Sequence, residues 1–239
     1  MAVVYVLLNQ KGGVGKSTVA VNLAAVTAEV TGAHLGPDDP SPVAAVSIDP
    51  QGSAVWWGSR VDNLPFHVVQ AHADFDQLKR LRDLPGIDTV FVDTPGWLDV
   101  TDQQEQQDPR DPLGEGPAGD ALRAVLECAD MVVVPITTEP LTFDPTARTI
   151  RKVIEPRGIP YRVVLNAWDP RDGEVERDEA LEFIRRSGWP GTKTVIRRYK
   201  VHTRASLNGQ VVTEYASSGT ALRAREDFYK LALELRAGM

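Results

Sequence analysis

The sequence predicts an α/β fold in which a doubly wound, mostly parallel sheet is flanked by helices. Short β-rich runs alternate with helical stretches along the chain, and this alternation builds parallel sheets from right-handed strand–helix–strand units. The runs are predominantly apolar, as expected of parallel strands buried on both faces. A glycine-rich segment joins the first run to the first helix. One such sheet can account for all 239 residues, so we expect a single domain over residues 1–239.

The order of the elements follows from this alternation. The expected strands are Ala2–Leu8, Val43–Ile48, Phe66–Val69, Thr89–Val92, Met131–Ile136, Tyr161–Leu165 and Thr194–Ile196. The expected helices lie near Ser17–Val30, Asp74–Arg82, Asp120–Ala129, Asp144–Ile154, Glu174–Arg186 and Thr220–Leu235. A doubly wound sheet binds its ligand at the carboxyl ends of the strands, so residues that directly follow the strands are the first candidates for function.

Two connections interrupt the pattern and are expected to be mobile loops. Residues 31–42 are rich in turn-forming residues, and residues 99–119 are polar, acidic and rich in proline and glycine. Such composition cannot build a packed core. The second connection is interpreted either as a plain surface insertion or as a lid or partner-contact segment.

Composition limits the class of protein. The chain contains no run of 18 apolar residues, so we expect neither a membrane span nor a signal peptide and predict a cytoplasmic protein. The single cysteine, Cys128, allows neither an internal disulfide nor a cysteine-based metal cluster and is expected to be buried.

The net charge of −7 is unevenly distributed. Residues 1–130 carry a net charge of −11, whereas residues 131–239 carry +4. Within the second half, basic residues from Arg185 to Arg204 are followed by no acidic residue until Glu214. This stretch is interpreted as a contact surface for a phosphate backbone, with a solvated face as the alternative.

The segment between the first strand and the first helix, Gln10–Thr18, reads QKGGVGKST. It follows the phosphate-loop pattern G-x-x-x-x-G-K-[ST], except that Gln10 replaces the first glycine and an additional lysine, Lys11, comes next. Its three glycines leave consecutive backbone N–H groups free to fold around polyphosphate oxygens. The sequence therefore predicts a P-loop NTPase fold with a deviant, two-lysine loop that binds a nucleoside triphosphate.

The chemistry of the loop indicates how ATP or ADP would be held with Mg²⁺. Lys16 can reach the β and γ phosphates, and the hydroxyl of Ser17 can ligate the metal. The helix that begins near Ser17 points its positive end at the same phosphates. The residues expected to bind nucleotide are Gly12, Gly13, Val14, Gly15, Lys16, Ser17, Thr18 and Asn166.

Polar residues also follow later strands. Asp49 comes after the second apolar run and Asp93 after the fourth. Carboxylates at these positions can orient an attacking water or hold a magnesium-bound water. Asn166 follows a late strand, where an amide can both donate to and accept from an adenine edge.

These motifs together resemble the ParA-type members of the deviant Walker A ATPases, a family that partitions plasmids and chromosomes. The matching segments are QKGGVGKST with the following VNLA, DPQGSA at 49–54, VDTPG at 92–96, ADMVVVP at 129–135, LNAWD at 165–169 and IRRYKVHTRASLNGQ at 196–210. The phosphate loop begins at residue 10, so the resemblance is to the small form without an N-terminal helix-turn-helix domain, and operator binding is not expected.

The resemblance implies an ATPase that dimerises on ATP, binds double-stranded DNA non-specifically and hydrolyses ATP slowly with Mg²⁺ when a ParB-like adaptor stimulates it. It would be associated with the nucleoid and not with a membrane. The resemblance assigns catalytic roles to Lys16 in its own subunit, to Lys11 across the two-fold interface and to Asp49 on the water. Asp93 would hold the metal through water, and Asn166 would contact adenine. The DNA-binding residues it implies are Arg197, Arg198, Lys200 and Arg204.

One departure and three alternatives accompany this resemblance. Similar sequences show D-x-D-P-Q, whereas this chain has Ser47 at the first aspartate, which favours unusually slow hydrolysis. The alternatives are an ATPase that positions a non-DNA cargo on the nucleoid, a membrane-positioning ATPase of the MinD type and a metabolic or electron-transfer relative. The membrane type requires a basic amphipathic C-terminal helix, and the electron-transfer type requires bridging cysteines.

Overall fold

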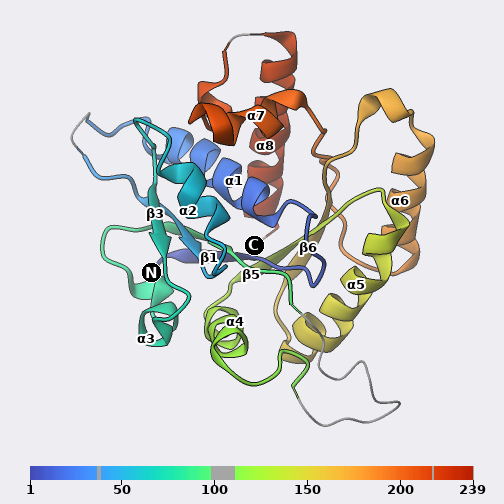
Figure 1. Ribbon diagram of the computed structural model, residues 1–239, viewed down its shortest axis with the longest axis horizontal. Helices are drawn as coiled ribbons and strands as arrows, with labels where there is room; N and C mark the ends of the chain where they lie inside the picture. Colours follow the sequence, from blue (N-terminus) through green and yellow to red (C-terminus); the bar gives the residue numbers. More distant parts are fainter. Residues whose placement is uncertain (37–38, 98–110, 217, 239) are drawn as a thin grey trace.

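The computed structural model describes residues 1–36, 39–97, 111–216 and 218–238. Its centre is a parallel six-stranded sheet in the order β3-β2-β4-β1-β5-β6 (Figure 1). The strands are β1 (Val3–Leu7), β2 (Val43–Ser47), β3 (His67–Gln70), β4 (Thr89–Asp93), β5 (Met131–Ile136) and β6 (Tyr161–Leu165). The chain winds from β1 to one edge, returns to β4 beside β1 and then proceeds to the other edge. The predicted doubly wound parallel sheet is therefore confirmed.

Helices cover both faces of the sheet (Figure 1). One layer contains α1 (Lys16–Thr31), α2 (Ser53–Gly58), α7 (Lys200–Asn208) and α8 (Gly219–Ala237). The other contains α3 (Phe75–Leu78), α4 (Pro117–Glu127), α5 (Phe143–Arg148) and α6 (Val175–Arg186). Each layer packs on the sheet through its own cluster of buried apolar side chains. The sheet is thus buried on both faces, which explains why its central strands are predominantly apolar.

The expected strand at Thr194–Ile196 is wrong. This segment meets β6 only at isolated points, such as the bond from the Ile196 N–H to the Leu165 carbonyl at 2.9 Å. A carboxylate of α8 takes the neighbouring donors instead, because Glu234 accepts from the backbone N–H groups of Lys193 at 2.6 Å and Thr194 at 3.0 Å. The Glu234 side chain of a distant helix therefore takes the place of a neighbouring strand as the hydrogen-bond partner of this segment.

Two helices were not predicted from the sequence, and both lack a clear apolar period. Helix α2 has only six residues and begins after Gly52, whose φ is 64°. Helix α7 buries only Ala205 among its nine residues. A helix with so little buried surface leaves almost no periodic signal.

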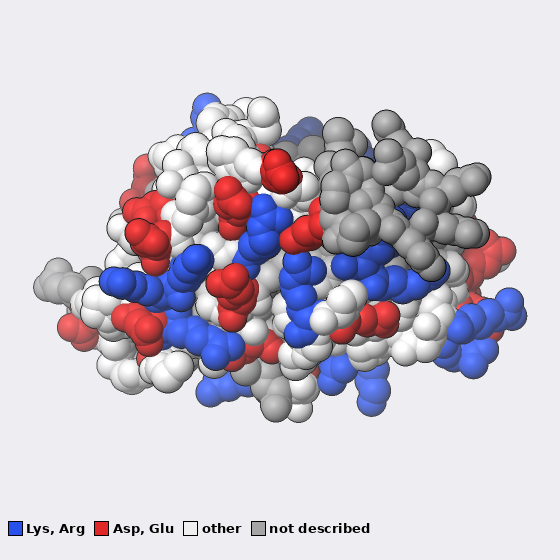
Figure 2. All heavy atoms as spheres, turned by 90° about the horizontal axis from the view of Figure 1, so that it is seen from below, with Lys and Arg blue, Asp and Glu red and all other residues white. Residues whose placement is uncertain are grey.

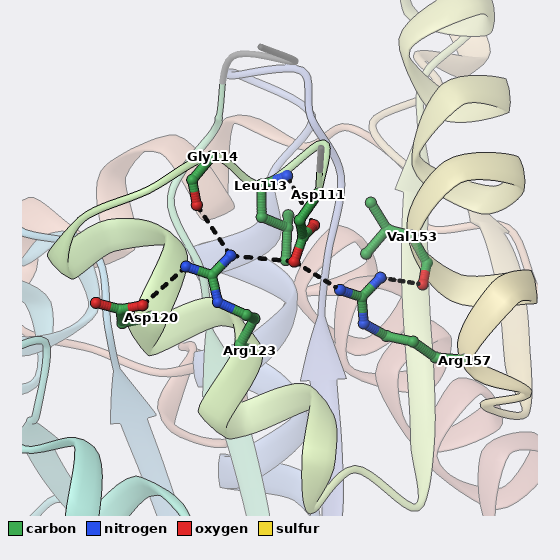
Figure 3. Close-up of polar contacts among 7 residues, drawn as sticks. All are labelled: Asp111, Leu113, Gly114, Asp120, Arg123, Val153 and Arg157. Carbon is green, nitrogen blue, oxygen red and sulfur yellow. Dashed lines mark hydrogen bonds and ion pairs between the residues drawn. The ribbon is translucent and has the colours of Figure 1, made fainter. Parts of the chain in front are cut away.

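Most of the connection at 99–119, which was expected to be mobile, lies outside the described residues. Its proposed role as a lid or partner-contact segment therefore stays a prediction. Its described end is anchored by an ionic cluster (Figure 3). The carboxylate of Asp111 accepts from Arg123 of α4 at 3.0 Å and from Arg157 at 3.2 Å. Arg123 also donates to the carbonyl of Gly114 at 2.9 Å. This cluster attaches the chain to α4 and to the turn after α5, so this end of the connection is held in a defined place.

His202 is a residue of α7, and its imidazole lies in an environment that disfavours its charged form. Its Nδ1 lies 3.1 Å from the hydroxyl of Tyr215, and its ring packs edge-on against Phe228. Its Nε2 is buried and has no hydrogen-bond partner in the part of the chain that the structure describes. Burial lowers the pKa of His202 to about 4.

This low pKa predicts a loss of stability in mild acid. The unfolded chain binds a proton at His202 near pH 6.5, whereas the folded chain does so only near pH 4. This contribution to the free energy of unfolding is therefore full above about pH 6.5 and falls by about 2 kcal/mol as the pH approaches about 4. Urea unfolding of the native protein and of His202→Gln across this range should show a steeper pH dependence in the native protein. Equal slopes would contradict the assignment.

Candidate functional site

The glycine-rich loop lies at the carboxyl end of β1 and leads directly into α1. Gly13 and Gly15 have φ angles of 80° and 88°, a backbone conformation that L side chains rarely adopt. A Cβ atom on Gly15 would also lie 2.3 Å from Nδ2 of Asn166. Both the backbone conformation and the packing therefore require glycine at Gly15.

Asn166 packs against this loop and forms a hydrogen bond to it. Its Nδ2 donates to the Val14 carbonyl at 2.8 Å, and its backbone N–H donates to the Ile136 carbonyl at 2.7 Å. Only 4 % of the residue is exposed. The predicted adenine contact stays a prediction, but the amide donor is already used to hold the loop against the end of β6. The next residue, Ala167, has a φ of 59°, so the chain turns sharply here.

A second buried amide was missed by the sequence reasoning. Asn9 is fully buried at the end of β1, and its Nδ2 donates to the Pro135 carbonyl and to the Thr146 hydroxyl, both at 2.8 Å. Its Oδ1 accepts from the backbone N–H of Lys11 at 3.0 Å. Asn9 thus fixes the start of the loop. A polar residue closing the first apolar run was the available signal.

The two loop lysines lie in different environments. Lys16 is buried, and its ammonium donates to the carbonyls of Asn9 and Lys11 at 3.1 Å each. Burial lowers the pKa of Lys16, while the negative charges of Asp93 and Asp49 act in the opposite direction. Lys11 is half-buried, and its side chain has no salt bridge to a residue that the structure describes. The curled loop therefore holds one ammonium inside and leaves the other near the surface.

Asp93 closes β4 beside this loop and is fully buried. Neither of its carboxylate oxygens has a hydrogen-bond partner of good geometry among the described residues. Burial raises the pKa of Asp93 to about 7, with a smaller push from Asp49, while Ser17 and Lys16 oppose the rise. A buried carboxylate without partners beside a serine hydroxyl supplies the hard oxygen ligands that Mg²⁺ prefers. The residues present therefore fit the predicted metal.

Asp49 lies in the turn that follows β2. Its Oδ1 accepts from the Gln51 N–H at 2.9 Å, and its carbonyl accepts from Gln70 Nε2 at 2.8 Å. It is near enough to Lys16 and Asp93 to influence the pKa of both. The structure thus brings Asp49, Asp93 and Lys16 together at one edge of the sheet.

The segment after β4 closes against the same loop. The Trp97 N–H donates to the Gln10 carbonyl at 3.2 Å, and the Thr94 hydroxyl donates to the Leu7 carbonyl at 2.6 Å. A Cβ atom on Gly96 would lie 3.1 Å from the Gln10 carbonyl oxygen. The motif at 92–96 is therefore one wall of the loop.

Thr18, which is also expected to bind nucleotide, is half-buried in the first turn of α1.

The structure separates the predicted DNA-binding residues into two groups. Arg197 donates to the buried carboxylate of Asp227 at 2.5 and 2.9 Å, so its charge is neutralised within the fold. Arg198, Lys200 and Arg204 are exposed on α7 or just before it. On the face of α3, α4 and α5, acidic and basic side chains are interspersed (Figure 2), so that face offers no continuous basic surface among the residues shown in colour.

This geometry has counterparts among known proteins. A family described as the CobQ/CobB/MinD/ParA nucleotide binding domain matches residues 5–212. The chain belongs to this family. It contains the nucleotide-binding ATPase domain of the CobQ/CobB/MinD/ParA proteins, which confirms the predicted ParA-type relationship.

Individual CobQ/CobB/MinD/ParA proteins extend the comparison. The chain is 36 % identical over 234 residues to the maintenance of carboxysome distribution protein A of Gloeobacter kilaueensis, covering 97 % of this chain and 93 % of that protein. It is 28 % identical over 251 residues to the chromosome-partitioning ATPase Soj of Thermus thermophilus, covering 97 % and 94 %. The structure of apo McdA from Cyanothece has a TM-score of 0.69 at 14 % identity, covering 98 % and 100 %. Among the described helices, none has the length and apolar character that crossing a bilayer requires.

Proposed function

We propose that this protein is an ATP-driven positioning ATPase that uses DNA as its track and a large protein assembly as its cargo. The observation that carries the proposal is the full-length similarity to a protein named for carboxysome distribution, in a chain that keeps the two-lysine loop. Because of this similarity, we favour the positioning of a non-DNA cargo over DNA partition. Localisation on the nucleoid in the cytoplasm follows from the proposed track.

The proposed cycle uses the residues at the carboxyl edge of the sheet. Lys16 binds the β and γ phosphates, and the backbone N–H groups of the loop surround them. Ser17, and Asp93 through water, would hold Mg²⁺, which when bound would supply charge that stabilises the phosphoryl group. Asp49 orients the hydrolytic water. Lys11, near the surface, reaches the phosphates of a second subunit, so that ATP favours a homodimer.

A second candidate function is segregation of DNA with a ParB-like adaptor. It is favoured by the similarity to Soj, a chromosome-partitioning ATPase. The two functions share the ATP cycle and differ in cargo. Deleting the gene in its native host distinguishes them, because cargo positioning predicts mislocalised protein assemblies with DNA inherited normally, whereas segregation predicts DNA loss.

The other two alternatives receive less support. A membrane-positioning function needs a free apolar face on the C-terminal helix, but α8 packs Phe228, Leu231 and Leu235 into the cluster that it shares with α1. An electron-transfer role needs bridging cysteines. Cys128 is buried, with its thiol 3.3 Å from the Leu78 carbonyl, and burial raises the pKa of its thiol to about 11.

The proposed DNA contact consists of Arg198, Lys200 and Arg204. Their exposed side chains lie where an ATP-bound dimer would present two copies of the same patch. Charges separated by more than about 8 Å are largely screened at physiological salt. A local patch can therefore bind phosphates although the whole chain carries a net charge of −7.

We predict that duplex DNA of random sequence binds only with ATP and Mg²⁺. The logarithm of affinity should fall by about 0.9 per phosphate contact as the logarithm of salt concentration rises. Arg198→Ala or Lys200→Ala should lower this slope by about 1 without changing ATP affinity. Fluorescence anisotropy across a salt series measures both quantities, and Lys79→Ala, an exposed lysine of the opposite layer, is the matched control. Binding without ATP, or a slope that neither substitution changes, would exclude this surface.

A further inference from the structure

Three neighbouring strands end in polar side chains whose buried atoms lack partners. Ser47 on β2 is paired in register with Gln70 on β3 and with Asp93 on β4. The hydroxyl of Ser47 and the Oε1 of Gln70 are buried without a hydrogen-bond partner in the described part of the protein, and the two buried oxygens of Asp93 have no partner of good geometry there, although the Ser17 hydroxyl lies beside them. Residues in register on parallel strands point to the same face, about 4.8 Å apart. The three side chains therefore leave the same face of the sheet on adjacent strands, and we call them the polar row.

The row lies on the face that carries the nucleotide loop. Val68, two residues before Gln70, packs in the cluster beneath α1 and α2, and a Cβ atom on Gly52 would lie 3.4 Å from Oε1 of Gln70. At the other end of the row, Ser17 of α1 influences the pKa of Asp93. The row thus runs from the predicted metal site to the turn that contains Asp49.

Counting hydrogens shows that the row cannot satisfy itself. Ser47 and the neighbouring Ser17 supply two hydroxyl protons, while ionised Asp93 and Gln70 together present three acceptor oxygens. Buried acceptors of this kind are satisfied in proteins by ordered water, which donates two hydrogens. Water next to the carboxylate of Asp93 would supply the missing hydrogens.

Gln70 also makes a direct contact with the Asp49 turn. Its Nε2 donates to the Asp49 carbonyl at 2.8 Å and lies 3.0 Å from Nδ1 of His72. A carbonyl can only accept, so this contact determines which end of the amide faces Asp49. The other end, Oε1, is buried beside Gly52.

We propose that Gln70 and Ser47 are positioning residues for ATP hydrolysis, which link the Asp49 turn to Asp93 through buried water. This inference rests on the proposed ATPase function. It also gives a reason for the serine that replaces the family's first aspartate, because the Ser47 hydroxyl continues the hydrogen-bonded row without adding a second buried charge beside Asp93.

The test compares Gln70→Met and Ser47→Ala with the native protein, with Gln77→Met, an exposed glutamine of α3, as the matched control. Steady-state turnover gives kcat and KM for ATP. Binding of a fluorescent ATP analogue with and without Mg²⁺ and the thermal unfolding midpoint are measured on the same samples. The proposal predicts that kcat falls about tenfold in both variants, while KM and nucleotide affinity change by less than about twofold. Gln77→Met should match the native protein.

The unfolding midpoint distinguishes a water-bound hydroxyl from one that is merely unsatisfied. Removing an unsatisfied buried hydroxyl raises the midpoint, whereas removing one that holds ordered water leaves it unchanged or lowers it, and the latter is expected for Ser47→Ala. Native kcat in both variants, or a loss of nucleotide affinity at unchanged kcat, would overturn the inference while leaving the proposed ATPase function intact. A native protein that does not hydrolyse ATP would overturn both.

Discussion

Lys16→Ala should lower ATP affinity by at least about 100-fold, because it removes the buried charge that binds the β and γ phosphates in the proposed cycle. The structure adds a second reason. The same ammonium donates to the carbonyls of Asn9 and Lys11 at 3.1 Å, so the substitution also releases two contacts that curl the loop. Isothermal titration with ATP and Mg²⁺ measures the loss.

Lys11→Ala is the control within the same loop. Its side chain makes no salt bridge to a described residue, so the variant should bind ATP nearly as well as the native protein. If the ammonium acts on the partner's phosphates, light scattering should show a monomer with ATP, where the native protein forms a dimer. A Lys11→Ala protein that still dimerises would exclude the proposed role of the second lysine, and a Lys16→Ala protein with native affinity would exclude the whole site.

Asp49→Ala should bind ATP and dimerise, yet hydrolyse ATP about 100-fold more slowly and persist as a dimer. The reason is that the variant lacks the group that we propose to orient the water, whereas it keeps the residues of the phosphate loop. Phosphate release and light scattering over time measure the two effects.

The hydrogen bond from the Gln51 N–H to Asp49 Oδ1 requires a further control. Asp49→Asn keeps an oxygen for this bond and removes the negative charge. Slow hydrolysis in both variants supports a role on the water, whereas native turnover in Asp49→Asn would show that the residue acts by capping the turn. Native turnover in both would make Asp93 the catalytic candidate.

Much of the fold could be predicted because its signals are local. Buried parallel strands are apolar runs, and β5 was predicted with its observed bounds at Met131–Ile136. The phosphate loop is a contiguous string whose glycines have a conformational reason at Gly13 and Gly15. The partners of these residues could not be predicted, since Asn9 and Asn166 hold the loop through bonds across more than 100 positions.

The sequence alone determined that this chain forms a doubly wound sheet with a two-lysine phosphate loop and carboxylates after two strands, because each depends on neighbouring residues. Tertiary structure decided what the remaining polar groups do. In the folded chain, Arg197 forms an ion pair with Asp227. The backbone N–H groups of Lys193 and Thr194 donate to the carboxylate of Glu234. Ser47 lies in register with Gln70 and Asp93 on neighbouring strands. Such contacts join segments far apart in the chain, and only the packing of helices on the sheet determines which of them meet.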